Sequence, residues 1–135
     1  MKLITVAAAI ILNDHGEMLL VRKKGTDYFM QVGGKLEENE QPQEALLREI
    51  QEEIGVSAEI IQDFGLIKTQ AANEAGHQLH AYVFHVQLHD TPVALAELAE
   101  LRWIHPTQAQ QLLLAPLTEQ FVLPVIARLN PAIMV

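Results

Sequence analysis

The segment from Pro42 to Gly55 constrains the fold most, because its residues define one amphipathic helix with a clear start and a clear end. Proline is suited to the first helical position, and glycine after the last turn is typical of a left-handed C-terminal cap. The apolar side comprises Leu46, Leu47, Ile50 and Ile54. These positions recur at helical spacing, so the helix is expected to pack one face against another layer.

The remaining apolar segments predict that this layer is a sheet. Strands are expected over Ile4–Leu12, Glu17–Lys23, Phe29–Val32, Ala58–Thr69, Leu79–Leu88 and Leu101–Ile104. The turn sequence 13–16 predicts that the first two strands form a hairpin. Helices are expected over Pro106–Leu114 and Leu117–Leu129. We therefore predict an α/β (α+β) fold in which sheets are sandwiched between helices.

Length and composition narrow the class of protein. The 135 residues fit one domain spanning 1–135. The net charge of −8 argues against nucleic acid or an anionic membrane as the main partner. The apolar N-terminal stretch is short and rich in β-branched residues, which favours a buried strand over a signal peptide. The chain has no cysteine, which excludes disulfides and thiolate metal sites and fits a cytoplasmic location.

Acidic side chains gather on the central helix. Glu49, Glu52 and Glu53 stand at i, i+3 and i+4 and share one face, and the last two occupy the final turn. Like charges at this spacing repel, and the helix dipole disfavours anions at the C-terminus. A hard divalent cation such as Mg²⁺ would neutralise them with oxygen ligands. Taken alone, the same residues also fit an ordinary solvated helix face.

The residues that flank the helix favour the metal-binding interpretation. Gly34 is followed after five residues by Glu40, and after seven more by the run from Arg48 to Val56, REIQEEIGV. This pattern reproduces the Nudix box over residues 34–56, and the chain resembles the Nudix hydrolase family, in particular its MutT-like and CTP pyrophosphohydrolase-like branches. The resemblance implies a Nudix-type α/β/α sandwich with a mixed sheet and a loop–helix–loop catalytic motif.

The resemblance also implies roles for residues in the box. Glu49, Glu52 and Glu53 would be catalytic metal ligands for Mg²⁺, with Mn²⁺ as an alternative. The carbonyl of Gly33 or Gly34 would complete the metal shell. Arg48 is expected to orient the glutamates through an ion pair to Glu52, and Glu40 to stabilise the loop. A purely structural role stays open for Glu40 and Arg48.

Residues outside the box complete the expected site. Arg22, Lys23 and Lys35 lie where the family places cations near phosphates. The first two point to opposite faces of a strand, so only one can enter the site. For an additional metal-binding carboxylate, Glu97 is favoured over Glu100. Glu97 lies on a connection expected to be mobile, and its place six residues before Trp103 is similar to that of the metal-approaching glutamate in the MutT-like branch, whereas Glu100 is expected on the solvent side of a strand, paired with Arg102.

The implied reaction is metal-dependent attack of water on phosphorus in a diphosphate linkage of a nucleoside di- or triphosphate. ADP-ribose or a dinucleoside polyphosphate is an alternative substrate, and a nucleotide-binding sensor without catalysis is an alternative function. The histidines at 77, 80, 85 and 89 are expected to be ordinary surface or core residues rather than a zinc site. Phe29 and Tyr82 are expected in the core rather than stacked on a base. The apolar Leu117–Leu129 segment and the tail Ala132–Val135 leave a homodimer open.

Overall fold

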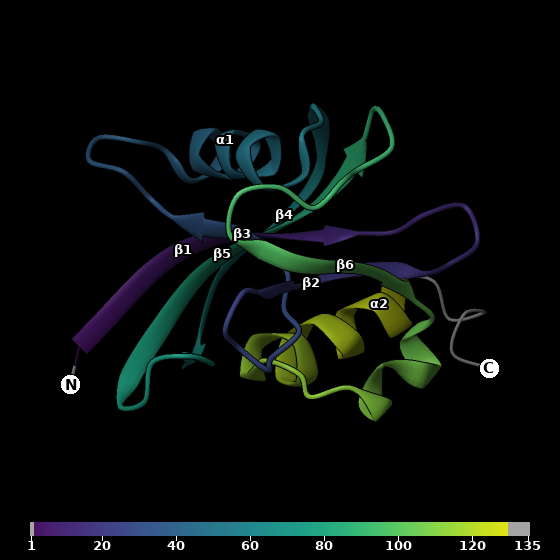
Figure 1. Ribbon diagram of the computed structural model, residues 1–135. Helices are drawn as coiled ribbons and strands as arrows, with labels where there is room; N and C mark the ends of the chain where they lie inside the picture. The colour runs from purple at the N-terminus through teal and green to yellow at the C-terminus, as the bar shows by residue number, and fades with distance from the viewer. Residues whose placement is uncertain (1, 130–135) are drawn as a thin grey trace.

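The computed structural model describes residues 2–129, and its centre is a curved mixed sheet (Figure 1). Four strands lie in the order β3-β1-β5-β4, with bounds β3 Val32–Lys35, β1 Lys2–Ile11, β5 His77–Leu88 and β4 Ala58–Gln70. β1 runs parallel to β5, and the other neighbours pair antiparallel. A second, two-stranded sheet pairs β2 (Met18–Lys23) with β6 (Leu98–Ile104).

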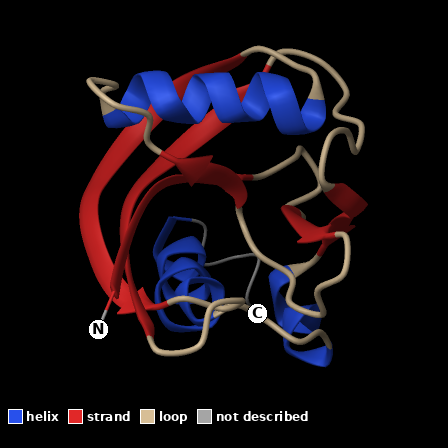
Figure 2. Cartoon of the chain, turned by 60° about the vertical axis from the view of Figure 1, so that its left-hand side comes forward, coloured by secondary structure: helices blue, strands red, loops and turns tan. Residues whose placement is uncertain are grey.

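Helices cover both faces of the four-stranded sheet (Figure 2). Helix α1 (Pro42–Ile54) lies on one face, and α2 (Leu123–Leu129) lies on the other. Alternate residues of β1 enter the two cores: Ala7 and Ala9 pack in the cluster that contains the α1 side chains, and Ala8 and Ile10 pack in the cluster that contains the α2 side chains. The predicted α/β/α arrangement with a mixed sheet is confirmed.

The expected hairpin between the first two strands is wrong. β2 pairs antiparallel with β6, with Leu19 opposite Trp103, and meets β1 through the single bridge Leu12–Met18. β5 pairs with the whole of β1 on one side and β3 pairs with Val6–Ala9 on the other, so most of the β1 edges are already occupied. The turn at 13–16 therefore carries the chain from one sheet into the other.

Helix α1 begins and ends where the sequence predicts. The Gln41 N–H donates to Glu44 Oε1 at 2.9 Å, which satisfies one backbone group at the N-terminus. Gly55 adopts φ 72° and its N–H donates to Gln51 O at 3.1 Å, which closes the C-terminus. Leu47 was expected on the buried side but is 38% exposed, and Ala45 is buried instead.

The C-terminal part contains shorter and less regular helices than expected. Only Pro106–Gln111 (η1) is helical in the first predicted segment, and it is a 3₁₀ helix. The second contains a π-helical turn, η2 (Thr118–Val122), before α2. Pro124 accounts for this turn, because its ring lacks an N–H and would collide with the carbonyl four residues earlier in an α-helix. Leu123 N–H accordingly donates to Thr118 O, five residues back.

One further predicted strand is displaced in the structure, and one predicted segment lies outside the described residues. The expected strand 29–32 is displaced, since β3 starts at Val32 while Phe29 and Met30 make single bridges to Leu114 and Val21. The tail Ala132–Val135 lies outside the described residues. Among residues 2–129, no helix has the length and apolar character needed to cross a membrane.

Candidate active site

Two glycines of β3 bring the sheet backbone against the glutamates of α1. The Gly33 N–H donates to Glu53 Oε1 at 3.3 Å. A Cβ on Gly34 would lie 2.4 Å from Cδ of Glu49, and a Cβ on Gly33 would lie 2.0 Å from the carbonyl oxygen of Ala7. Glycine at Gly33 is therefore required by the close approach of the β1 backbone, and glycine at Gly34 leaves room for the Glu49 carboxylate.

Glu53 is a buried carboxylate, with a relative exposure of 7%. Burial raises its pKa to about 7, the Gly33 N–H and Lys23 act in the opposite direction, and the charges of Glu49 and Glu97 add to the increase. Burial also raises the pKa of Glu49, against the effect of Arg48. Two adjacent carboxylates whose charged forms are disfavoured are candidates for binding a cation.

Arg48 connects the loop before α1 to the glutamates on the helix. Its Nε lies 2.8 Å from Glu40 Oε2, and its NH1 lies 2.9 Å from Glu49 Oε1 and 3.3 Å from Glu52 Oε2. Its NH2 donates to the carbonyl oxygen of Lys35 at 3.1 Å. The guanidinium holds the pKa of Glu40 at about 2, so Glu40 is ionised throughout the physiological range. The ion pair to Glu52 that the sequence suggested is present, but Glu40 and Glu49 are closer.

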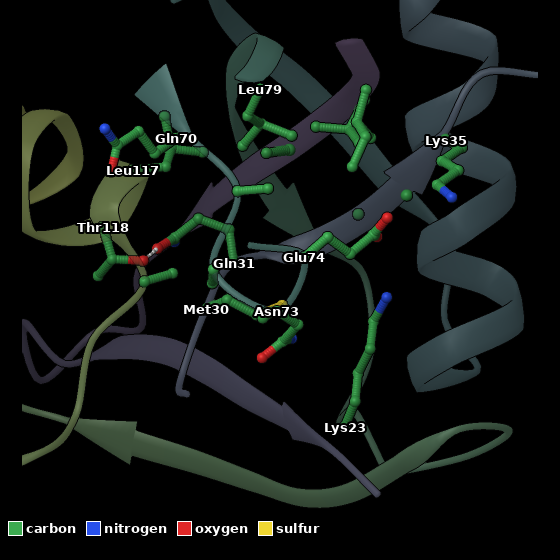
Figure 3. Close-up of a pocket in the computed structure, with 18 of the residues that line it drawn as sticks. Lys23, Met30, Gln31, Lys35, Gln70, Asn73, Glu74, Leu79, Leu117 and Thr118 are labelled. Carbon is green, nitrogen blue, oxygen red and sulfur yellow. Dashed lines mark hydrogen bonds between the residues drawn. The ribbon is translucent and has the colours of Figure 1, made fainter. Parts of the chain in front are cut away.

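The basic residues of β2 separate as strand alternation requires. Arg22 pairs with Glu100 at 3.2 Å and donates to the carbonyl of Thr26 at 2.8 Å. Lys23 instead lines the cleft next to the box, together with Gly33, Gly34 and Lys35 (Figure 3). Of the two cations, Lys23 is thus the one placed beside the glutamates.

Glu97 and Glu100 have different surroundings. Glu100 accepts from both Arg22 and Arg102, and these contacts lower its pKa. Glu97 is exposed at a hollow that Lys23 also lines, and its charge contributes to the raised pKa of Glu53. Glu97 is therefore near enough for its charge to act on Glu53, whereas Glu100 is engaged by arginines.

The connection that carries Glu97 makes backbone hydrogen bonds to the end of α1 and to β2, and its expected mobility stays a prediction. Leu95 N–H donates to Glu53 O at 2.9 Å, and Val93 N–H donates to Ile54 O at 3.1 Å. The carbonyl of Glu97 accepts from Lys24 N–H at 2.8 Å. The connection thus satisfies carbonyl groups that the end of α1 leaves free, and it is hydrogen-bonded to the helix that carries the glutamates.

The structure adds residues that the sequence analysis missed. Gln31, Asn73, Glu74 and Thr118 line the same cleft as Lys23 and Lys35. Gln31, beside β3, and Thr118, in the C-terminal helical segment, are polar residues within apolar segments. This interruption of the apolar pattern could have identified them as candidate site residues. Asn73 and Glu74 lie between β4 and β5, in a polar segment that no pattern relates to the box.

Within residues 2–129, nothing supports base stacking by Phe29 or Tyr82 or a zinc site formed by the histidines. Phe29 is 7% exposed in the α2-side core, and Tyr82 packs against the α1-side core. Neither lines the cleft. Within residues 2–129, no three His, Cys, Asp or Glu side chains are grouped as a ready-made metal cage.

The donor set nevertheless fits Mg²⁺. This ion takes oxygen ligands, retains several waters, and is typically bound through one or two carboxylates together with substrate phosphates. Glu49 and Glu53 are neighbouring carboxylates with raised pKa values, and Glu52, Glu97 and the backbone of Gly33 and Gly34 lie around them. Ion pairing of Arg48 with Glu49 and Glu52 holds two of these carboxylates in place.

The contact between Gly34 and Glu49 gives a test that separates activity from folding. Gly34→Ala is expected to lower kcat at least tenfold, because the new methyl group displaces the Glu49 carboxylate. The melting temperature should change little, since the displaced atoms are the end of a flexible side chain. Gly65→Asn is the control, because nothing lies within 4 Å of a Cβ there and asparagine tolerates its positive φ of 78°. A large fall in melting temperature for Gly34→Ala would contradict this account.

Comparison with known proteins agrees with this geometry. The NUDIX domain family matches residues 1–127. The CTP pyrophosphohydrolase of Escherichia coli is 32% identical over 119 residues, which cover 86% of each protein. An 8-oxo-dGTP diphosphatase of Haemophilus influenzae is 43% identical over 61 residues, covering 42% of this chain and 45% of that protein.

Solved structures show the same fold. The solution structure of the E. coli ORF135 protein is 34% identical, with a TM-score of 0.77 over 98% of this chain and 94% of that one. The NUDIX domain of Shewanella oneidensis NrtR, solved with ADP ribose, shares the fold at 16% identity, with a TM-score of 0.78 over 96% of this chain and 90% of that one. The chain belongs to the NUDIX domain family and is a Nudix hydrolase.

Proposed function

We propose that this enzyme uses Mg²⁺ to hydrolyse a diphosphate linkage in a nucleoside triphosphate, with a cytosine nucleotide as the first substrate to test. The observation that carries the proposal is the buried Glu53 carboxylate beside Glu49, against the two glycines that line a cleft together with Lys23 and Lys35. The CTP pyrophosphohydrolase of E. coli, which matches most of this chain, supports the choice of nucleotide.

Each residue would contribute through charge and position. Bound Mg²⁺ would neutralise the charge of the diphosphate and would lower the pKa of a water molecule bound to it. Glu49, Glu52, Glu53 and Glu97, with a carbonyl of Gly33 or Gly34, would hold the ion. Arg48 would keep Glu49 and Glu52 oriented. Lys23 and Lys35 would bind phosphate oxygens, and a glutamate that is ionised above its raised pKa would accept the proton from the attacking water.

The Glu97 assignment has a direct test against Glu100. Glu97→Gln is expected to reduce kcat at least tenfold at saturating Mg²⁺, because it removes a carboxylate whose charge acts on Glu53. Glu100→Gln should change kcat less than threefold, since Glu100 is engaged by Arg22 and Arg102. A loss confined to Glu100→Gln would exchange the two assignments, and no loss in either would remove Glu97 from the site.

The function itself is tested by a substrate screen with Mg²⁺. The panel contains CTP, UTP, the purine triphosphates, 8-oxo-dGTP, ADP-ribose and a dinucleoside polyphosphate, and the products are identified by mass spectrometry. We expect a nucleoside triphosphate to give the highest kcat/KM, with a nucleoside monophosphate and pyrophosphate as products. Preference for ADP-ribose or a dinucleoside polyphosphate would replace the proposed substrate. Binding without turnover across the panel would indicate a sensor.

A further inference from the structure

A four-residue turn, 95–98, carries Glu97 between the end of α1 and the strand β6. The Leu98 N–H donates to the carbonyl oxygen of Leu95 at 3.0 Å, and this bond closes the turn. Ala96 and Glu97 are its two central residues. The first of them, Ala96, has a φ of 51°, in the left-handed region. The direction in which the chain leaves the turn therefore depends on an unusual backbone conformation of Ala96.

A left-handed backbone is unfavourable for alanine, because its Cβ comes too close to the following carbonyl oxygen. Turns with a positive φ at the first central position are usually built with glycine, asparagine or aspartate. Among the non-glycine residues that the structure describes, only Asn39 and Ala96 have a positive φ. Asparagine tolerates this conformation, whereas alanine is strained by it. Strain of this kind persists only where surrounding contacts hold the backbone, and it is concentrated at functional sites.

Backbone hydrogen bonds hold the turn on both sides of Ala96. On one side, the Leu95 N–H donates to the carbonyl oxygen of Glu53 at 2.9 Å. On the other side, the carbonyl oxygen of Glu97 accepts from the Lys24 N–H at 2.8 Å. The first bond attaches the turn to a glutamate of the box, and the second attaches it to the residue after Lys23, which lines the cleft (Figure 3). The turn thus joins two segments that carry site residues.

The turn places Glu97 at a hollow beside the cleft. Ala96, Glu97 and Lys23 line this hollow together. Because the chain is hydrogen-bonded both before and after Ala96, a negative φ at this residue would redirect the chain that follows it. The Glu97 side chain would then leave its place next to Lys23, or the bond between Glu97 and Lys24 would break. The position of the Glu97 carboxylate is therefore coupled to the φ of Ala96.

We propose that Ala96 is a positioning residue for Glu97, whose left-handed backbone holds the Glu97 carboxylate beside the metal-binding glutamates. This inference rests on the proposed function and deepens it, because it assigns part of the metal affinity to a residue that does not touch the metal. Substitutions of Ala96 should act according to their tolerance of a positive φ. Glycine and asparagine tolerate it, whereas threonine is β-branched and does not.

The experiment measures Mn²⁺ affinity without nucleotide, by electron paramagnetic resonance, in the parent and in three variants. Ala96→Gly and Ala96→Asn should keep the affinity within threefold of the parent, and Ala96→Thr should weaken it at least fivefold. Asparagine and threonine are both polar and similar in size, so the difference between them reports the backbone. In EDTA, Ala96→Gly should melt no lower than the parent, because relief of strain offsets the greater freedom of glycine in the unfolded chain.

A double-mutant cycle tests whether Ala96 acts through Glu97. Glu97→Gln alone should weaken Mn²⁺ binding at least fivefold, and adding Ala96→Thr to it should weaken binding less than twofold further. A full further loss in that background would show a route independent of Glu97, and an unchanged affinity in Glu97→Gln would remove the carboxylate from the site. Either result overturns the inference.

The other variants separate positioning from bulk and from folding. Equal losses of Mn²⁺ affinity in Ala96→Asn and Ala96→Thr would assign the effect to side-chain bulk in the hollow. An Ala96→Thr protein that melts below the parent but binds Mn²⁺ equally well would show a role in folding alone. Both results also overturn the inference. If no nucleotide is hydrolysed by the parent, the proposed function fails, and the Mn²⁺ comparison still decides the role of Ala96.

Discussion

Glu53→Gln is expected to lower kcat at least 100-fold and, in metal-free buffer above pH 7, to raise the free energy of unfolding. The parent loses stability there, because its carboxylate must ionise while buried. A glutamine of the same shape can accept the same N–H bond from Gly33 without carrying charge. The loss of rate follows from removal of a metal-binding carboxylate.

The pH dependence of this stability difference has a definite sign. The folded-state pKa of Glu53 is raised from 4.5 to about 7, so the folded protein binds the proton more tightly than the unfolded chain. The free energy of unfolding of the parent therefore falls as pH rises from 4.5 to 7, by about 2–3 kcal/mol, and stays low above pH 7. Glu53→Gln should melt roughly 5–10 °C above the parent at pH 8 and close to it near pH 4.5.

The melting temperatures of the parent and of Glu53→Gln in EDTA at pH 4.5 and pH 8 measure this difference. The kcat of both proteins is measured in Mg²⁺ at pH 8. Glu59→Gln is the matched control, because Glu59 is exposed on β4, away from the cleft. It should change neither quantity. A Glu53→Gln protein that melts many degrees below the parent at pH 8 would show that the residue has a structural role.

Removal of divalent metal is expected to reduce hydrolysis at least 1000-fold, with full recovery when excess Mg²⁺ is added. Without metal, the glutamates around Gly33 and Gly34 repel the negatively charged polyphosphate. The positive charges of Lys23 and Lys35 are too few to neutralise both the glutamates and the polyphosphate. In Mg²⁺ the rate should increase as pH rises, since both water and glutamate must be deprotonated. Undiminished hydrolysis after exhaustive chelation would contradict the metal-dependent mechanism.

Local sequence signals predicted the helix that carries the site but not the pairing of the strands. Pro42 and Gly55 define α1 because proline and glycine act on backbone angles within a few residues. The partner of β2 is β6, about 80 residues away in sequence, while β3 and β5 occupy most of the edges of β1. No local pattern contains that information. An interruption of the predicted helix 117–129 near Pro124 could have been anticipated from proline alone.

The same distinction between local signals and tertiary contacts applies to the candidate site. The box glutamates share a face because of their spacing, and strand alternation separates Arg22 from Lys23. Gln31 accepts a hydrogen bond from Thr118, 87 residues away, so a single polar residue in an apolar segment did not predict that the two residues line the cleft together. The anchoring of the Glu97 connection to the last carbonyls of α1 is likewise a tertiary contact.

The most direct test of a metal held by these glutamates is the affinity for Mn²⁺, measured by electron paramagnetic resonance without nucleotide. The parent should bind Mn²⁺, and Mg²⁺ should compete for the site. Glu49→Gln and Glu53→Gln should each weaken binding at least tenfold, while Glu59→Gln should leave it unchanged. Equal Mn²⁺ affinity in the parent and in both Glu49→Gln and Glu53→Gln would contradict the assignment of these residues as the metal site.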